Sequence, residues 1–289
     1  MPETYGAHEC RAYYVVESTY GQTPTNPSMI GINAENVEPT LDPTLVKVRG
    51  VGSRDVAFIR GTVWKPSLKI SHILPSNSPI NFIQHASTLN SLSIQVLWYK
   101  GLFGSATDII SLLFKGMRID KLTVECSLYD VVKASVELIG QNVSVSTSKI
   151  SGATYTDYTG AVPSDESYVQ RGYGDGSYLT PLERVTDWKF TIENNLKPVP
   201  VIRTTSGHLL KYLPARHRNL TGELALEFED KQEFDDFIAE VEFSLKFGLG
   251  STRYALFKYC KWENVTALTH IEDLVSVKAR FVAKEVVLS

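Results

Sequence analysis

The sequence has few of the residues that metal sites, disulfide frameworks and membrane spans require. Three cysteines occur in 289 residues (Cys10, Cys126 and Cys260), and the absence of a CxxC spacing excludes a zinc ribbon or a dithiol redox motif. The most apolar stretch, residues 109–114, is far shorter than the ~20 residues of a membrane-spanning helix. The N-terminus has no basic region followed by an apolar run. We therefore expect free thiols, no membrane partner, and a soluble protein made in the cytoplasm.

The sequence has no large excess of charge of one sign, and it lacks the common catalytic motifs. Lys and Arg number 29 against 32 Asp and Glu, a net charge of −3, which excludes a protein that grips nucleic acid through a basic surface. There is no GxSxG, GxxxxGK[ST] or HExxH motif, and the six histidines show no ligand spacing. Gly172, Gly174 and Gly176 fit a turn better than a dinucleotide fingerprint. The sequence predicts no catalytic residue, no metal site, no cofactor and no enzyme.

Period-2 alternation of apolar and polar residues dominates what is present. It occurs over residues 68–74, 92–98, 122–126, 132–138, 190–192, 224–228 and 275–283. A strand with one wetted face gives this pattern, and antiparallel sheets show it because parallel strands are buried on both faces. We therefore predict a mainly β protein, an antiparallel β-sandwich or barrel with one or two short flanking helices.

Helical signals are few and short. The best covers residues 231–239, with Asp230 as the N-cap and Glu233 at position N3 of a capping box. A weaker candidate covers residues 79–86, where a proline suits the first helical position. A third is a short helical segment over residues 107–114. None is long enough to cover a parallel sheet.

Two stretches divide the chain. Residues 18–44 contain four prolines, so we expect residues 1–44 to form an extended N-terminal arm. Residues 144–182 are rich in Ser, Thr, Gly and Tyr and predict a long interaction loop. The loop would join two halves, about 45–143 and 183–289. Both halves show a strand–helix–strand order, which predicts a pseudo-repeat: 63–74, 79–86 and 92–99 against 220–228, 231–239 and 254–258.

Interaction features are more promising than catalytic ones. Residues 45–61 form two strand-like arms around a glycine-rich turn and predict a projecting hairpin with charges of both signs: Arg49, Arg54, Asp55 and Arg60. The hairpin is either an ordinary surface hairpin or an arm that docks on another subunit by adding strands to its edge. Among 14 tyrosines, Tyr173 and Tyr178 lie in the predicted loop, where they suit a contact surface or a solvated loop.

Several short segments of the sequence resemble tail tube proteins of tailed bacterial and archaeal viruses. They are ESTYGQTP at 17–24, GVGSRD at 50–55, KGMRIDKLTV at 115–124, FTIENNL at 190–196, RNLTGEL at 218–224 and FED at 228–230. The resemblance covers nearly the whole chain in element order, with residues 45–289 as the tail-tube-like β domain. It implies a β-sandwich or barrel with a flanking helix.

The resemblance also implies an assembly. Subunits would join into hexameric rings, and the rings would stack into a conduit for genome delivery in a virion tail. Its partners would be further copies and other tail proteins: tape measure, terminator, hub and sheath. DNA would pass through the lumen without specific binding, which suits a chain with a net charge of −3 and no basic stripe.

Two alternatives remain open at this stage. A tail hub or terminator ring would share the fold and differ in copy number. A carbohydrate- or receptor-binding β-sandwich would need an aromatic cleft with convergent Asp and Asn, for which the tyrosine-rich loop is the one candidate. Rings or tubes in micrographs would favour the tube, and a glycan-binding monomer would favour the β-sandwich.

Overall fold

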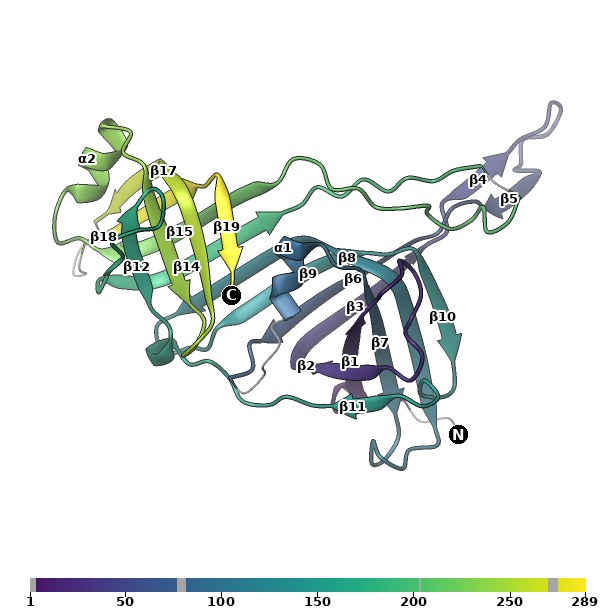
Figure 1. Cartoon of the computed structure of the whole chain (residues 1–289). Coiled ribbons are helices and arrows are strands. Elements are labelled where there is room, and N and C mark those ends of the chain that lie inside the picture. The colour runs from purple at the N-terminus through teal and green to yellow at the C-terminus, as the bar shows by residue number, and fades with distance from the viewer. Residues whose placement is uncertain (1–3, 77–81, 203, 270–274) are drawn as a thin grey trace.

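The computed structural model describes residues 4–76, 82–202, 204–269 and 275–289, and it is mainly β, as predicted. Figure 1 shows two β lobes joined by long strands, with a thin hairpin projecting from one corner. The N-terminal lobe and hairpin contain β1 (Cys10–Val16), β2 (Ser28–Ile32), β3 (Ala34–Asp42), β4 (Leu45–Val48), β5 (Phe58–Gly61), β6 (Lys65–Ile73), β7 (Leu92–Tyr99), β8 (Ile109–Ser127), β9 (Lys133–Ile139), β10 (Asn142–Ser146) and β11 (Thr154–Thr156).

The C-terminal lobe is built in the same way. Its strands are β12 (Val169–Tyr173), β13 (Thr180–Pro181), β14 (Val185–Glu193), β15 (Asn219–Glu227), β16 (Phe243–Gly248), β17 (Tyr254–Leu268), β18 (Ser276–Val282) and β19 (Glu285–Leu288). Among the described residues each lobe has one short α-helix, α1 (His85–Thr88) and α2 (Gln232–Ile238).

One antiparallel sheet runs through both lobes, in the order β3-β6-β9-β8-β14-β15-β18-β17. We call it the central sheet. Strands β8 and β17 are long enough to leave it and join a second layer in their own lobe, beside β7 and β10 or beside β16 and β19. The pairing of β8 with β14 is what makes the central sheet continuous.

The core lies between the central sheet and these second layers. Trp188, Phe190 and Ile192 alternate along β14 and are buried, while the residues between them are not. The ring of Phe190 packs 5.0 Å from that of Phe257 on β17, which ties the two layers together. Burying one such side chain stabilises the fold by roughly 1.5–3 kcal/mol. The alternation seen in the sequence therefore marks the inner face of this sheet.

The strand pairings of the first lobe recur in the second. The pairs β1–β2, β1–β7, β7–β8, β8–β10, β8–β9, β6–β9 and β3–β6 correspond to β12–β13, β12–β16, β16–β17, β17–β19, β17–β18, β15–β18 and β14–β15. We call residues 10–146 and 169–288, which contain these pairs, the two repeats. Their limits differ from the predicted halves 45–143 and 183–289, because β1–β3 and β12–β13 pair inside their own repeats.

The registers of the repeats match as closely as their strand order. Register shifts occur between Ala34 and Asn36, Leu92 and Ile94, and Ile119 and Lys121 in the first repeat. In the second repeat they lie at the corresponding places, Val185/Asp187, Phe243/Leu245 and Trp262/Asn264. Because a bulge bends a strand at a defined point, the three matched shifts put such bends at corresponding strand positions in both repeats.

One bulge also repeats its unusual backbone conformation. Gly116 has φ 66° and Tyr259, at the matching position, has φ 52°. The Gly116 N–H donates to the Glu17 carboxylate at 2.8 Å, and the Tyr259 N–H donates to the Gly174 carbonyl at 2.7 Å. Glu17 and Gly174 themselves hold matching positions after β1 and β12. Glycine adopts this conformation without strain, whereas Tyr259 is held in it by its surroundings.

Three predicted segments differ from the structure. The expected arm, residues 1–44, contains β1, β2 and β3, and the four prolines of residues 18–44 fall in connections and on an edge strand rather than in a free arm. The predicted loop 144–182 carries β11, β12 and β13. Residues 107–114 are not helical, because from Ile109 onward they form the start of β8 and pair with β7 and β10.

The other two predicted helices are present in shortened form. Residues 231–239 contain α2, but its N-cap is Lys231, while Asp230 accepts the Gln232 N–H at 2.8 Å. Glu233 does not close a capping box, since its side chain is buried against Arg184. In the second candidate, residues 79–81 lie outside the described residues, and a 3-10 turn at Phe82–Gln84 leads into α1.

The cysteines are free, as predicted, and burial raises the pKa of Cys126 to about 11 and that of Cys260 to about 12. In the described part of the chain, no helix is long and apolar enough to cross a membrane.

Candidate assembly surfaces

The outer face of the central sheet, opposite the core, carries two rows of charges that cross the repeats. One row runs Glu38, Lys69, Glu137, Lys121 and Glu193, each directly opposite the next on a neighbouring strand. The other runs Lys133, Glu125, Lys189, Glu223 and Arg280. We call this surface the charged face. The ten charges of the two rows alternate in sign, five of each, so the rows together carry no net charge.

Within each row, ion pairs join residues on neighbouring strands. Lys121 Nζ lies 2.9 Å from Glu193 Oε1, Lys189 Nζ 3.1 Å from Glu125 Oε2, and Arg280 Nε 2.8 Å from Glu223 Oε2. The hydrogen bond from Lys121 lowers the pKa of Glu193, and the same contact raises the pKa of Lys121. These pairs are solvent-exposed, so each contributes at most ~1 kcal/mol to folding. They occupy three of the five basic groups of the rows, and a fourth, Lys133, pairs with Asp130.

A row of hydroxyl groups lies between the charged rows. Ser71, Ser135, Thr123, Thr191 and Thr221 are opposite one another on successive strands. The Thr123 and Thr191 hydroxyls are 3.2 Å apart, on β8 and β14, where the two repeats meet. This row places short neutral side chains between the charges.

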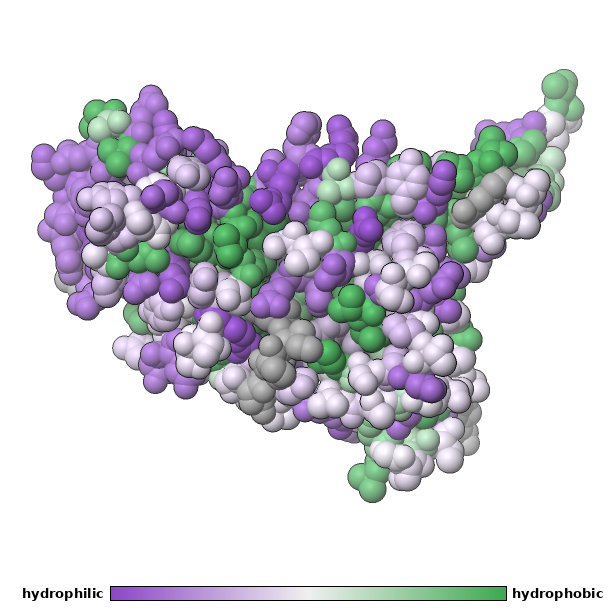
Figure 2. Space-filling model, viewed as in Figure 1, coloured by the Kyte–Doolittle hydropathy of each residue, from purple (hydrophilic) through white to green (hydrophobic). Residues whose placement is uncertain are grey.

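The hairpin predicted over residues 45–61 is present as β4 paired with β5. It stands away from both lobes, and Figure 2 shows hydrophobic atoms along it and at its tip. Arg49, Arg54, Asp55 and Arg60 are all exposed, and no ion pair joins them to another described residue. Its exposed apolar residues are Leu45, Val46, Val48, Val51, Phe58 and Ile59. Such a surface is costly to leave in water, and it fits a contact with another molecule.

The base of the hairpin is fixed by the connection between β14 and β15. The Trp64 N–H donates to the His208 carbonyl at 2.8 Å, and their rings are 5.1 Å apart. An apolar hollow of about 320 Å³ opens beside it, where Leu41, Trp64 and Val145 meet. The two connections between matching strands, β3 to β6 and β14 to β15, therefore extend to the same end of the molecule (Figure 1).

Tyr173 and Tyr178 lie together at the tight turn between β12 and β13. Their rings are 5.2 Å apart in an edge-on arrangement, and Tyr178 is 80% exposed. The turn is closed by the Tyr173 N–H donating to the Ser177 carbonyl at 2.9 Å. Strand β12 and the hairpin lie at opposite ends of the molecule in Figure 1, so the six predicted contact residues do not form one site within a chain.

The structure offers little for chemistry among the described residues. They contain no group of three or more His, Cys, Asp or Glu side chains that could hold a metal ion. A polar hollow of about 430 Å³ lies between β1, β3 and residues 157–159, where the Arg11 guanidinium pairs with Asp157. His270 lies outside the described residues. The surfaces above, rather than a cavity, are therefore the candidate functional site.

A family model described as phage tail tube protein matches residues 91–274, more than half of the chain. The chain belongs to the phage tail tube protein family. It is a subunit of a virion tail tube, a structural component of the tail. The matched residues include β7 to β17 and therefore the junction of the two repeats.

Solved structures give further likenesses, all at low identity. The virion of a native gene transfer agent particle matches with 7% identity and a TM-score of 0.35 over 45% of this chain and 99% of that one. The tail of an empty gene transfer agent particle, with C6 symmetry, matches with 6% identity and a TM-score of 0.37 over 45% and 99%. A six-fold symmetrised anti-feeding prophage baseplate matches with 11% identity and a TM-score of 0.37 over 50% and 97%. No curated protein matches the chain.

In this tail tube protein, two of the sequence segments that carry the resemblance contact each other. The Glu17 carboxylate accepts the Gly21 N–H at 2.7 Å, the Gly116 N–H at 2.8 Å and the Ser93 hydroxyl at 2.7 Å. Glu17 is buried, so these three donors take the place of water. A side chain would not fit at Gly116, because a Cβ there would lie 2.8 Å from Gln141 Cβ. Residues 17–24 and 115–124 are therefore held together by the hydrogen bonds to the Glu17 carboxylate.

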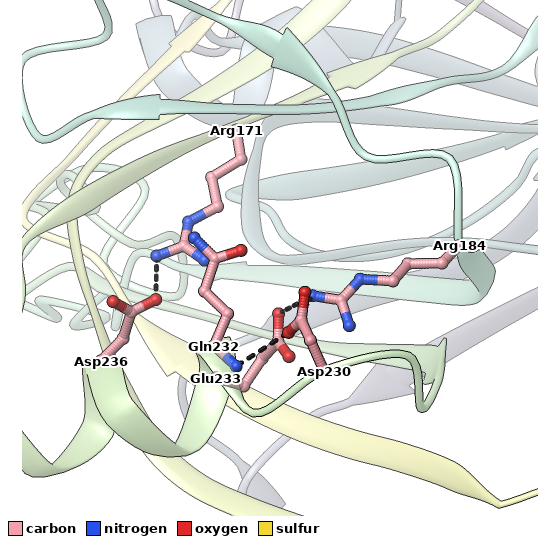
Figure 3. A network of polar contacts seen from close by, with 6 residues as sticks. All are labelled: Arg171, Arg184, Asp230, Gln232, Glu233 and Asp236. Atoms are coloured by element: carbon pink, nitrogen blue, oxygen red, sulfur yellow. Dashed lines mark hydrogen bonds and ion pairs between the residues drawn. The ribbon is translucent and has the colours of Figure 1, made fainter.

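A polar network under α2 was not among the features predicted from the sequence. Arg184 Nη2 lies 2.6 Å from Glu233 Oε1, both side chains are buried, and Arg171 pairs with Asp236 one turn further along. Figure 3 shows both arginines reaching toward the acidic residues of the helix, with Asp230 beside Arg184. A helical wheel would show Glu233 and Asp236 three residues apart, but the arginines come from distant segments, so no local signal identifies the pairs.

Proposed function

We propose that copies of this chain close into rings, that the rings stack into a tube, and that the charged face of the central sheet lines the lumen. The observation that carries the proposal is the continuous central sheet, whose outer face is charge-balanced and whose two ends, β3 and β17, are unpaired edges among the described residues. An unpaired strand edge exposes backbone hydrogen-bonding groups and makes a monomer prone to aggregation. In an assembly the same edge can pair with a strand of another subunit. The resemblance predicts hexameric rings.

A lumen wall of this kind suits the passage of DNA. Each phosphate neutralised by a lysine or arginine adds affinity, so a wall with free basic groups would hold the genome. On the charged face Lys121, Lys189 and Arg280 are each paired with a glutamate. The wall then presents DNA with alternating charges and hydroxyls rather than a basic track, and DNA passes without specific binding.

The hairpin is the part best placed to join one ring to the next. It projects beyond the lobes, and its apolar residues need cover that its own chain does not give. We assign Arg49, Arg54, Asp55 and Arg60 to contacts with a neighbouring subunit, with charges of both signs selecting the register. Tyr173 and Tyr178, at the other end of the molecule, would contribute to a different contact.

The remaining partners would be the other proteins of the tail: tape measure, terminator, hub and sheath. The subunit would be made in the host cytoplasm and act without cofactor or catalysis. A hub or terminator ring would use the same fold in one ring rather than a stack. A long tube formed by the purified chain alone supports the tube role over these two.

Negative-stain microscopy of the purified protein tests the proposal. We expect rings and tubes at high protein concentration. A protein that stays monomeric at every concentration, and binds glycans, would contradict the proposal and favour a carbohydrate-binding β-sandwich.

Deleting residues 48–58 tests the role of the hairpin. We expect a folded subunit, with the circular dichroism spectrum and unfolding midpoint of the parent chain, that forms single rings but no tubes. The hairpin lies outside both hydrophobic clusters of the core, so its loss leaves the packing of the lobes intact. Tubes of unchanged length would show that the hairpin does not dock.

A further inference from the structure

The junction of the two repeats shows how one repeat joins another. Strand β8 of the first repeat pairs with β14 of the second, from Lys121 opposite Glu193 to Ser127 opposite Asp187. The strand that matches β8 in the second repeat is β17, and the strand that matches β14 in the first is β3. Strands β17 and β3 end the central sheet, and neither has a partner on its outer side among the described residues.

The two outer edges carry apolar residues at the positions that match the residues buried at the junction. Trp188, Phe190 and Ile192 of β14 are buried, and the matching residues of β3 are Val37, Pro39 and Leu41, of which Leu41 is 50% exposed.

On the other strand of the junction, Leu122 and Val124 of β8 are buried. The matching residues of β17, Val265 and Ala267, are half-buried and exposed. Apolar residues at these positions on both edges therefore lack the cover that their counterparts have.

Polar residues on the outer face match across the edges as well. Thr123 and Thr191 form the hydroxyl pair at the junction, and the residues at the same positions on β17 and β3 are Thr266 and Thr40. Carried over from the junction register, Thr266 would lie opposite Thr40 of a second copy, and Asn264 opposite its Asp42. Pro39 has no N–H, which removes one donor from the ladder and limits unspecific pairing of this edge.

We propose that β17 of one copy pairs with β3 of the next in the register that joins β8 to β14 inside each chain. The occupant of both edges is thus a second copy of this chain, bound head to tail. Each chain contributes two equivalent repeats, so a ring contains twice as many repeats as chains. This inference rests on the proposed ring: if six equivalent units close it, three chains supply them, and the six-fold expectation applies to repeats.

A disulfide between copies tests the register. In a Cys10→Ser background, we would make Thr40→Cys with Thr266→Cys, since directly opposed strand residues have Cα atoms about 4.5–5.5 Å apart, within disulfide reach. The matched control is Thr123→Cys with Thr191→Cys, the same pair inside one chain. A second control, Thr40→Cys with Thr221→Cys, places one thiol in the middle of the sheet. Each protein would be oxidised after assembly and run on a non-reducing denaturing gel.

We expect the Thr40/Thr266 variant to form covalent species that end in a closed ring of three chains. The Thr123/Thr191 control should run as a monomer with its thiols lost, and the Thr40/Thr221 control should form no covalent series. Rings or tubes without interchain disulfides, alongside an oxidised Thr123/Thr191 control, would overturn the register. A closed covalent ring of six chains would overturn the three-chain ring. Protein that forms neither rings nor tubes would instead count against the proposed function.

Discussion

At the residue scale, a few side chains have environments that their sequence neighbours do not reveal. His72 alternates with Leu68, Ile70 and Leu74 and therefore points into the core, where its ring packs 5.6 Å from that of Phe82. Burial lowers the pKa of His72 to about 4. The unfolded chain, with an ordinary histidine pKa, binds this proton at a pH where the folded chain does not.

The pKa of His72 predicts how stability changes with pH. Because its folded pKa lies below its unfolded pKa of 6.5, its contribution is complete above pH 6.5 and is lost as the pH falls toward 4. The wild type should lose about 2 kcal/mol of unfolding free energy through this group between pH 7 and pH 5. His72→Leu should not show that loss in urea titrations at the two pH values. The difference between wild type and variant should thus depend on pH, and a difference that is the same at pH 7 and pH 5 would contradict the buried, neutral His72.

At the scale of elements, α2 is held in place by buried charge. Two of its apolar residues, Phe237 and Ile238, are exposed. Glu233, predicted to cap the helix, instead forms the buried pair with Arg184. A helix of seven residues is too short to be stable alone, so these contacts decide its position.

Removing the Glu233 carboxylate should therefore destabilise the fold well beyond the loss of a surface charge. Glu233→Ala leaves the Arg184 guanidinium buried without this partner, and we expect a loss of about 3 kcal/mol in unfolding free energy. Asp235→Ala, two residues along the same helix, removes an exposed pair with Lys231 and should cost less than about 1 kcal/mol. Chemical denaturation of both variants measures the contrast, and equal losses would show that the buried pair contributes no more than the exposed one.

At the scale of the whole molecule, the repeats form one sheet with two free edges. Leu41 lies on the β3 edge and is exposed in the single chain, so a charge there is tolerated by the fold. In the ring, the same charge would be buried against β17 of the next copy, without a counter-charge.

We therefore expect Leu41→Asp to abolish rings and tubes while the unfolding free energy changes by less than about 0.5 kcal/mol. Leu102→Asp, in the exposed turn between β7 and β8, should change neither ring formation nor folding. Size-exclusion chromatography with light scattering, together with micrographs, measures both. Normal rings from Leu41→Asp would place the β3 edge outside the interface.

Alternation along the chain was enough to predict the antiparallel class and strands at 68–74, 92–98, 122–126, 132–138, 190–192, 224–228 and 275–283, and the glycine-rich turn predicted the hairpin at 45–61. It reports which face a residue takes, because side chains in a strand point to opposite sides in turn. It placed Phe190 and Ile192 on one face of a strand, whereas Trp188, which is buried on the same face, was not among the predicted positions. The N-terminal arm was wrong because β3 is an edge strand, on which proline is tolerated, so its composition resembles that of a free segment.

Which strands become neighbours was decided by the tertiary structure alone. Lys121 and Glu193, or Thr123 and Thr191, become partners only because β8 pairs with β14 in one particular register. A shift of one residue would turn every side chain of β14 to the opposite face, so the buried aromatic residues select the register and the ion pairs follow from it. The sequence by itself determined a chain of amphipathic strands. The structure decided that they form the same set of pairings twice, because pairing energy comes from contacts between residues that are distant along the chain.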